Sequence, residues 1–238
     1  MKIAIMQPYF MPYIGYFQLI NAVDKFVVYD NIEYTKKGWI NRNRILVNGK
    51  DEFITIPLKK DSDFLPVNKR YLADFFPDER IKLLRKIKEM YRKAPCFTEI
   101  FPLMEEILIF ENKNLFDFIL HSLKIICRYL QIKTAFVTSS TIQIDHNLKS
   151  EQKVIAICKS LNANIYINPI GGMELYSKSN FEENKIQLQF LKSNPVTYLQ
   201  YQYDFVPWLS IIDVLMFNSI EEISVMLDKY ELISDYKN

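Results

Sequence analysis

Short apolar runs that end at polar residues set the hydrophobic pattern at the start of the chain. Lys2–Met6 is such a run and stops at Gln7, and Lys25–Tyr29 is a second run that stops at Asp30. Between them, Gly15–Ala22 has the pattern of a short helix. Because short continuous apolar runs are typical of strands covered on both faces, this order predicts the opening of a parallel βαβ unit.

The pattern then predicts a hairpin and a block of helices. Asn48-Gly49 separates two strand-like runs, and this dipeptide favours a tight turn, so we expect a β-hairpin over about residues 44–57. Apolar residues next recur at helical spacing. The predicted helices are Asp78–Lys93, Pro102–Phe110 and Leu115–Leu130. We expect them to form a helical subdomain at about residues 78–131, inserted in a single α/β domain that spans residues 1–238.

Alternation of strands and helices resumes after this block. The predicted strands are Thr134–Thr138, Asn164–Ile167 and an edge strand at Ile186–Leu191, in which apolar and polar residues alternate. The predicted helices are Ser150–Leu161, with Ser150 as its N-cap, Ser210–Phe217 and Ile220–Leu232. Strands that alternate with helices indicate an α/β protein. We therefore predict a three-layer α/β fold with a parallel, Rossmann-like sheet, the β-hairpin and the inserted helical block.

The charge balance and the cysteines argue against several classes of protein. Lys and Arg number 30 and Asp and Glu 28, which gives a net charge of +2, whereas proteins that coat nucleic acids carry an excess of basic residues. The three cysteines form no C-x-x-C pair, which argues for buried thiols in a reducing compartment and against zinc or redox motifs. We expect no nucleic acid partner and no bound metal.

The apolar segments are also too short to cross a bilayer. No apolar run approaches the roughly 18–20 residues that a membrane-spanning helix needs. The segment Met1–Phe10 carries one lysine and a short apolar run, and this pattern differs from a signal peptide. We therefore expect no membrane insertion and a cytoplasmic location.

Glycine is scarce, with five glycines in 238 residues, whereas an average chain has roughly 7%. The spacings of a Walker loop, of the dinucleotide-binding G-x-G-x-x-G and of the G-x-S-x-G elbow are absent. Gly49 is explained by the hairpin turn. The other four glycines fall in three loops beside aromatic and basic residues, which predicts close backbone approach at Gly15, Gly38, Gly171 and Gly172.

Two candidate binding loops directly follow predicted strands, where ligands bind in open α/β sheets. The loop Gln7–Tyr16 has four aromatic residues and two prolines. Its rings offer flat walls, and a helix that starts near Tyr13 offers amide groups for a phosphate. The loop Asn168–Ser177 contains two adjacent glycines. The candidate residues of the two loops are Gln7, Tyr9, Tyr13, Gly15, Gly171 and Gly172.

The segment Asp30–Arg44 holds the densest basic cluster of the chain, with a tryptophan and asparagines between the basic residues. Arginine forks match the oxygens of phosphates and carboxylates, and tryptophan stacks on flat rings, so the segment predicts a nucleotide-linked or phosphorylated ligand. Its candidate residues are Lys36, Trp39, Asn41, Arg42, Asn43 and Arg44. Ser139, at the end of a predicted strand, is a further candidate for ligand binding.

Several of these motifs together resemble the WbqC-like protein family. The residues that carry the resemblance are Gln7-Pro8, Pro12-Tyr13-x-Gly15-Tyr16-Phe17, Asp30, Asn41-Arg42-Asn43-Arg44, Gly171-Gly172-x-x-x-Tyr176 and Leu209-Ser210-Ile211-Ile212-Asp213. That family is associated with gene clusters for bacterial O-antigen, lipopolysaccharide and other surface polysaccharides, which commonly encode enzymes acting on nucleotide-linked amino sugars. The resemblance therefore implies a transferase that acylates or aminoacylates the amino group of such a sugar.

This transferase hypothesis assigns three kinds of role. The diphosphate is held by Lys36, Arg42 and Arg44, and the base or the sugar stacks on Tyr9, Tyr13 and Trp39. Asp30 or His146 accepts the proton of the attacking amine, since an ammonium must lose a proton to become a nucleophile. The hypothesis needs an acyl or aminoacyl donor, which the sequence does not name, and a homodimer is one assembly we consider.

The opening strand, loop, helix and strand are also similar to pantothenate synthetase and the nucleotidyltransferase superfamily. There an H-x-G-H-like signature binds ATP phosphates, whereas the corresponding place here is Pro12-Tyr13-Ile14-Gly15-Tyr16, with the glycine kept and both histidines absent. The first alternative is therefore an adenylate-forming ligase or nucleotidyltransferase that uses ATP and Mg²⁺. The second alternative is a non-catalytic sugar-nucleotide-binding protein, consistent with the small number of acid–base residues.

Overall fold

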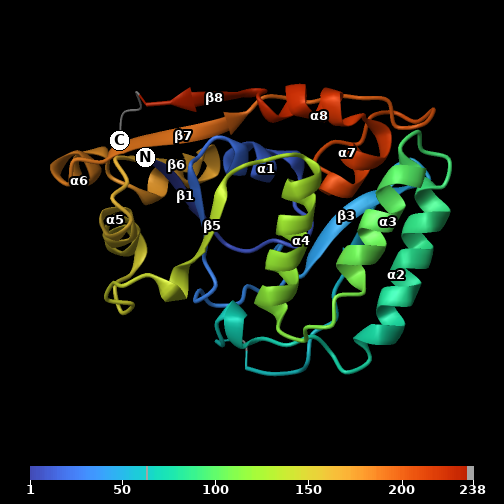
Figure 1. Cartoon of the computed structure of the whole chain (residues 1–238), viewed down its shortest axis with the longest axis horizontal. Coiled ribbons are helices and arrows are strands. Elements are labelled where there is room, and N and C mark those ends of the chain that lie inside the picture. The colour runs from blue at the N-terminus through green and yellow to red at the C-terminus, as the bar shows by residue number, and fades with distance from the viewer. Residues whose placement is uncertain (63, 235–238) are drawn as a thin grey trace.

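A six-stranded sheet lies at the centre of the computed structural model, which describes residues 1–62 and 64–234 (Figure 1). Its strands are β1 (Lys2–Met6), β2 (Lys25–Val28), β5 (Ala135–Thr138), β6 (Ile165–Pro169), β7 (Gln187–Ser193) and β8 (Tyr230–Ile233). They lie in the order β5-β2-β1-β6-β7-β8. Neighbours are parallel except β7 and β8, which pair antiparallel. This arrangement confirms the predicted α/β fold with a mostly parallel, Rossmann-like sheet.

Helices cover both faces of the sheet and complete three layers. On one face the hydrophobic cluster includes α1 (Ile14–Asn21), α2 (Phe76–Tyr91), α3 (Phe97–Leu108), α4 (Leu115–Tyr129), α7 (Ile211–Phe217) and α8 (Ile220–Leu227). The opposite face is covered by α5 (Ser150–Ser160) and α6 (Lys178–Glu183). Three short 3-10 turns are η1 (Val67–Lys69), η2 (Ser139–Thr141) and η3 (Ile170–Leu175). Within the described ranges, no helix has the length and apolar character needed to span a bilayer.

Alternate residues of the central strands pack into two separate hydrophobic clusters. In β1, Ala4 belongs to the cluster under α1 and α4, whereas Ile3 and Ile5 belong to the cluster under α5. In β2, Phe26 and Val27 divide in the same way. None of these five residues is more than 5% exposed. Because both faces of the sheet are buried, its strands form continuous apolar runs, which is why the sequence pattern locates them.

The predicted hairpin forms from β3 (Arg42–Val47) and β4 (Lys50–Thr55), which pair antiparallel outside the main sheet. Its turn residues Asn48 and Gly49 both have positive φ angles, of 50° and 79°. A two-residue type I′ turn requires positive φ at both central positions, and asparagine and glycine tolerate it best. The dipeptide therefore fixes the turn as predicted.

The predicted helical block is present as α2, α3 and α4, which lie side by side in Figure 1. Its apolar residues belong to the same hydrophobic cluster as one face of the sheet. The predicted start of the second helix was wrong, because α3 begins at Phe97 and Pro102 lies inside it. Ile100 and Met104, on either side of this proline, are fully buried, and their packing outweighs the hydrogen bond that proline removes.

Two predictions near the end of the chain were also wrong. β7 is not an edge strand, because β8 pairs with its far side. The helix predicted at Ile220–Leu232 ends at Leu227, and Tyr230–Ile233 forms β8 instead. The alternation in β7 reflects one exposed and one buried face, with Gln187 exposed and Leu188 buried, and this pattern does not report whether a strand has two neighbours.

Candidate functional site

A cavity of about 840 Å³, the strand-end cavity, lies at the carboxyl ends of β1, β2 and β6. Met6 and Gln7 line it beside β1, Tyr29 follows β2, and Asn168 belongs to β6. β1 is paired with β2 on one side and with β6 on the other. The helices α1 and α5 lie on opposite faces of the sheet, so the chain connections diverge at β1. Ligands of open α/β sheets bind at this kind of switch point.

Five predicted site residues line the strand-end cavity, namely Gln7, Tyr9, His146, Gly171 and Gly172. A Cβ added at Gly172 would lie 2.1 Å from Nδ2 of Asn168, whereas one added at Gly171 meets nothing within 4 Å. The close approach expected of these glycines is therefore present at Gly172 and absent at Gly171.

Lys153 of α5 lines the same cavity, although it was not among the predicted residues. It is 6% exposed. Its Nζ donates to the carbonyl oxygen of His146 at 3.2 Å and lies 5.1 Å from the ring centroid of Tyr29. No carboxylate in the described part of the chain forms an ion pair with it. Burial lowers the pKa of Lys153 and outweighs the attraction of Asp30 and Asp145.

The start of α5 lies beside Lys153 on the cavity wall. Lys149 and Ser150 line the cavity here. The predicted cap was wrong, because Lys149 takes the N-cap position and its side chain accepts no hydrogen bond from the helix. Amide groups in a first helical turn carry partial positive charge and attract anions. Together with Lys153, they give this side of the cavity a positive wall.

His146 is held on the cavity wall through both ring nitrogens. Nδ1 lies 3.1 Å from Nδ2 of Asn31, and Nε2 lies 3.1 Å from the carbonyl oxygen of Ile142. A carbonyl oxygen only accepts, so Nε2 carries the proton and Nδ1 accepts from Asn31. The side-chain oxygen of Asn31 in turn lies 2.7 Å from Oγ of Ser139, whose single hydroxyl proton is shared between this oxygen and the carboxylate of Asp30. A chain of polar side chains therefore orients the imidazole.

Asp30 lies behind this wall, at the end of β2. It is 2% exposed and accepts hydrogen bonds from Oγ of Ser139 (2.8 Å), the amide of Ser140 (2.8 Å) and Nδ2 of Asn68 (2.7 Å). Burial alone raises the pKa of Asp30, but these hydrogen bonds outweigh burial and hold the pKa below its ordinary value. Such a carboxylate is a weak base, and its contacts suit holding Ser139 and Asn31 in place.

A second cavity, of about 280 Å³, shares Tyr9 with the strand-end cavity. This aromatic cavity is lined by Tyr9, Pro12, Tyr13, Trp39, Asn43, Arg44 and Trp208. The first two predicted segments therefore meet here, one after β1 and one around the start of β3. Trp208, from the loop before α7, completes the wall and was not among the predicted residues.

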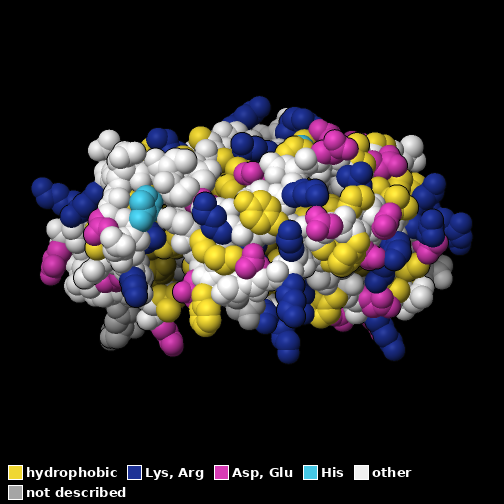
Figure 2. Space-filling view, turned by 90° about the horizontal axis from the view of Figure 1, so that it is seen from below, with side chains coloured by type: hydrophobic (Ala, Val, Ile, Leu, Met, Phe, Trp, Pro, Cys, Tyr) yellow, Lys and Arg dark blue, Asp and Glu magenta, His cyan; other side chains and the backbone are white. Residues whose placement is uncertain are grey.

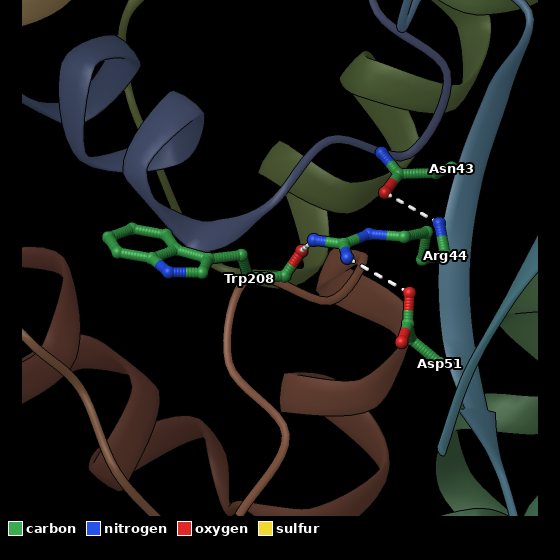
Figure 3. A network of polar contacts seen from close by, with 4 residues as sticks. All are labelled: Asn43, Arg44, Asp51 and Trp208. Atoms are coloured by element: carbon green, nitrogen blue, oxygen red, sulfur yellow. Dashed lines mark hydrogen bonds and ion pairs between the residues drawn. The ribbon is translucent and has the colours of Figure 1, made fainter.

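Arg44 joins three segments around the aromatic cavity, as Figure 3 shows. Its Nη1 pairs with Asp51 at 2.9 Å, and its Nη2 donates to the carbonyl oxygen of Trp208 at 3.3 Å. Its backbone amide donates to Oδ1 of Asn43 at 2.8 Å. The other end of the Asn43 amide donates to the carbonyl oxygen of Met11 at 2.9 Å. Asn43 therefore fastens the loop after β1 to the hairpin.

Two further predicted residues, Arg42 and Asn41, line neither cavity. Their side chains contact residues of the hairpin and of the loops beside it. Nε of Arg42 donates to the carbonyl oxygen of Gly38 at 3.1 Å, and its guanidinium lies 4.4 Å from the ring centroid of Phe53. Asn41 is 8% exposed and donates to the carbonyl oxygen of Ile56 at 2.8 Å. Their contacts stabilise the hairpin and the loop that precedes it.

Gly15 and Lys36 also lie outside both cavities. A Cβ added at Gly15 would lie 2.3 Å from the ring of Tyr13, so glycine is needed here for a ring of the aromatic cavity to pack. Lys36 is exposed in the segment between β2 and β3.

Charge is mixed on the face of the molecule shown in Figure 2. Figure 2 shows basic and acidic side chains interspersed across the face in view. Within residues 1–62 and 64–234, no three His, Cys, Asp or Glu side chains are grouped so as to hold a metal ion.

Comparison with known proteins finds one family. The model of the WbqC-like protein family matches residues 7–225. The chain belongs to this family. A relative from Mycobacterium tuberculosis, "Uncharacterized protein Rv1507c", is 30% identical over 216 residues, which make up 90% of this chain and 92% of the relative. No solved structure matches the chain.

The part that matches the WbqC-like family contains Lys153 and Trp208, the two residues missed from the sequence. Lys153 is four positions before Ile157, and both lie on the buried face of α5. Residues four apart share one face of a helix, so this spacing was a signal that Lys153 points inward. Trp208 follows no periodic pattern, and its rarity as one of two tryptophans was the only signal.

Proposed function

We propose that this WbqC-like protein is a transferase that binds a nucleotide-linked amino sugar in the strand-end cavity and acylates or aminoacylates its amino group. The observation that supports it is Lys153, a buried ammonium on the cavity wall with no carboxylate partner among the described residues. Burying an unpaired charge costs several kcal/mol, and a bound anion offsets that cost. The diphosphate of a nucleotide-linked sugar supplies such an anion.

The surroundings of Lys153 suit a phosphate-bearing ligand. The helix start at Lys149 and Ser150 lies on the same wall, and backbone amides at a helix start commonly hold phosphates. The cavity of about 840 Å³ falls within the range of roughly 300–1,000 Å³ that small-molecule sites occupy. These features support a phosphate-bearing small molecule.

The proposed transfer needs one proton acceptor. The sugar ammonium loses a proton and its nitrogen attacks the carbonyl carbon of the donor, so that a C–N bond forms while the bond to the donor's leaving group breaks and the leaving group takes a proton. We assign the acceptor role to His146, which lines the cavity. The substrate ammonium then replaces Asn31 at Nδ1. Asp30 and Ser139 act as positioning residues for this pair.

One observation favours a second candidate, a non-catalytic protein that binds sugar nucleotides. Asp30 is saturated with hydrogen bonds, and both ring nitrogens of His146 have partners. Neither predicted proton acceptor is therefore free, and the same cavity then binds its ligand without turnover.

Turnover and affinity together test the proposed function. The protein is incubated with UDP-glucosamine and a panel of acyl and aminoacyl donors, with and without ATP and Mg²⁺, and the products are followed by mass spectrometry. The proposal predicts an N-acylated sugar nucleotide. Release of pyrophosphate that depends on ATP indicates the adenylate-forming alternative, and binding without product indicates the non-catalytic candidate.

The site itself is tested by calorimetry with UDP-glucosamine. Lys153→Met is expected to weaken affinity at least about 30-fold, because it removes one partner of a buried charge pair. Lys159→Met, at an exposed position of the same helix, is the matched control and is expected to keep the wild-type affinity. Equal affinities of Lys153→Met and the wild type would overturn the assignment.

A further inference from the structure

The aromatic cavity gathers the tryptophans of this chain at one place. The chain has two tryptophans, Trp39 and Trp208, and both line this cavity. They are 39% and 57% exposed, although large aromatic side chains are usually buried or engaged at binding surfaces. Tyr9 lines both the aromatic cavity and the strand-end cavity, so the two cavities are neighbours.

Contacts with neighbouring side chains hold these rings in place. Trp39 packs against Phe53 with ring centroids 6.2 Å apart, and the guanidinium of Arg44 lies 5.7 Å from the Trp39 ring. Trp208 meets Tyr13 edge to face at 5.8 Å. Rings fixed in this way lose little conformational entropy when a flat ligand stacks on them.

Arg44 supplies hydrogen-bond donors beside the rings. Its Nε is buried and has no partner among the described residues. In Figure 3 the indole ring of Trp208 projects away from the contacts of Arg44 with Asp51 and the Trp208 carbonyl oxygen. Arg44 lines the aromatic cavity and its side chain is 25% exposed. A guanidinium only donates, so a ligand group that contacts Arg44 must be an acceptor.

Two backbone positions beside the cavity are in a conformation unusual for their residue type. Trp208 and Met11 have φ angles of 59° and 41°, which bulky L residues rarely adopt. Hydrogen bonds hold both, since Nη2 of Arg44 donates to the carbonyl oxygen of Trp208, and Oγ of Ser210 donates to that of Met11 at 2.7 Å. Strain that the surroundings hold in this way is typical of ligand sites.

We propose that the aromatic cavity binds a nucleobase with carbonyl oxygens, such as uracil, whose diphosphate passes Tyr9 and reaches Lys153. The base stacks on Trp39 and Trp208, because every base has a π face, and its oxygens accept from Arg44. This inference rests on the proposed function, since the phosphate site at Lys153 fixes where the rest of the nucleotide lies. It assigns the base to one cavity and leaves the strand-end cavity to the diphosphate and the sugar.

Tryptophan fluorescence tests this assignment directly, because both reporters are in the cavity. The wild type is titrated with UDP, inorganic pyrophosphate and glucosamine 1-phosphate, and calorimetry measures the three affinities in parallel. UDP is expected to quench the emission, while pyrophosphate binds without quenching. Trp208→Ala is expected to lower UDP affinity about 5- to 100-fold, the range of one stacking contact, and to leave pyrophosphate affinity unchanged.

The controls separate stacking from folding. Trp208→Phe keeps a flat ring and is expected to recover most of the UDP affinity, and Phe75→Ala, an exposed ring outside both cavities, is expected to match the wild type. If glucosamine 1-phosphate quenches the emission and UDP does not, the sugar rather than the base binds in the aromatic cavity. That result would overturn the base assignment without affecting the phosphate site at Lys153. UDP binding without a fluorescence change also overturns it. If neither UDP nor pyrophosphate binds the wild type, the proposed function fails first and this inference with it.

Discussion

Two buried charges have opposite surroundings in this protein. Asp213 of α7 is fully buried and accepts hydrogen bonds from the hydroxyls of Tyr91 and Tyr198, both at 2.8 Å, and from Nε2 of Gln200 at 2.6 Å. Lys153 is almost as deeply buried but contacts one carbonyl oxygen and one ring. A satisfied buried charge joins elements of the fold, whereas an uncompensated one beside a cavity is suited to an anionic ligand.

The largest effect on stability is expected at Asp213. Asp213→Ala is predicted to lower the free energy of unfolding by about 3–5 kcal/mol, because three hydrogen-bond donors, two of them buried, lose their acceptor. Burial raises the pKa of Asp213 and outweighs the three hydrogen bonds, which lower it. Asp213→Asn keeps one acceptor oxygen and is therefore expected to lose less stability than the alanine variant. Denaturant unfolding followed by circular dichroism measures both. A loss below about 1 kcal/mol in the alanine variant would remove the contrast between the two regions.

A smaller and pH-dependent loss of unfolding free energy is expected when Asp30 is replaced. Asp30→Ala is predicted to cost about 1–3 kcal/mol near neutral pH. The folded-state pKa of Asp30 lies below its ordinary value, so the contribution is fully present above the unfolded pKa of about 3.9 and is lost as pH falls through the folded value. Unfolding free energies of variant and wild type should therefore converge in acid. A difference that stays constant down to about pH 3 would contradict this account of Asp30.

Lys153 should behave in the opposite way to Asp213. Lys153→Met is expected to leave the free energy of unfolding within about 1 kcal/mol of the wild type or to raise it, because it removes an uncompensated buried charge. The folded-state pKa of Lys153 is lowered, so its cost is present below that pKa and disappears as pH rises past the unfolded value of about 10.4. Any gain in the unfolding free energy of the variant is therefore expected at neutral pH and should vanish at alkaline pH. A marked loss of stability would mean that Lys153 is a structural residue after all.

The smallest effect is expected at Arg42. The sequence hypothesis places its guanidinium on the diphosphate, but the structure turns it toward the carbonyl oxygen of Gly38 and the ring of Phe53. Arg42→Ala is therefore expected to change UDP affinity by less than about 3-fold, whereas Arg44→Ala should weaken it more, since charged hydrogen bonds contribute about 1.5–3 kcal/mol. Calorimetry on both variants measures the two losses of UDP affinity. A larger loss in Arg42→Ala than in Arg44→Ala would support the sequence hypothesis that Arg42 binds the diphosphate.

The sequence says more about where the candidate site lies than about the role of each residue in it. Ligand loops follow parallel strands, so Gln7, Tyr9 and Gly172 were predicted from loops that follow strands, Gly172 also from the pair of adjacent glycines. All three line the strand-end cavity. Polar residues in those loops were harder to assign. Asn43 and Ser139 satisfy the backbone or a buried carboxylate, and a sequence does not show which partner a polar side chain takes.

Lys153 and Trp208 line the two cavities but were not predicted from the sequence. A lysine in a helix is normally solvent-exposed. The spacing of Lys153 from Ile157 indicates a buried face, but only the three-dimensional structure shows that this face borders the cavity at Lys153. Trp208 comes from an irregular loop whose course depends on hydrogen bonds of the following Ser210 to Arg44 and Met11, more than 160 residues away. Such long-range contacts leave no periodic trace in the sequence.

Side-chain NMR of Lys153 tests the central claim most directly. The Nζ resonance, assigned with Lys153→Met, is titrated with pH in the free protein and in the presence of saturating inorganic pyrophosphate. An adjacent anion favours the charged form of a lysine, so the account predicts a pKa below the ordinary value of about 10.4 in the free protein and a clear rise on binding. An ordinary pKa that pyrophosphate leaves unchanged would contradict it.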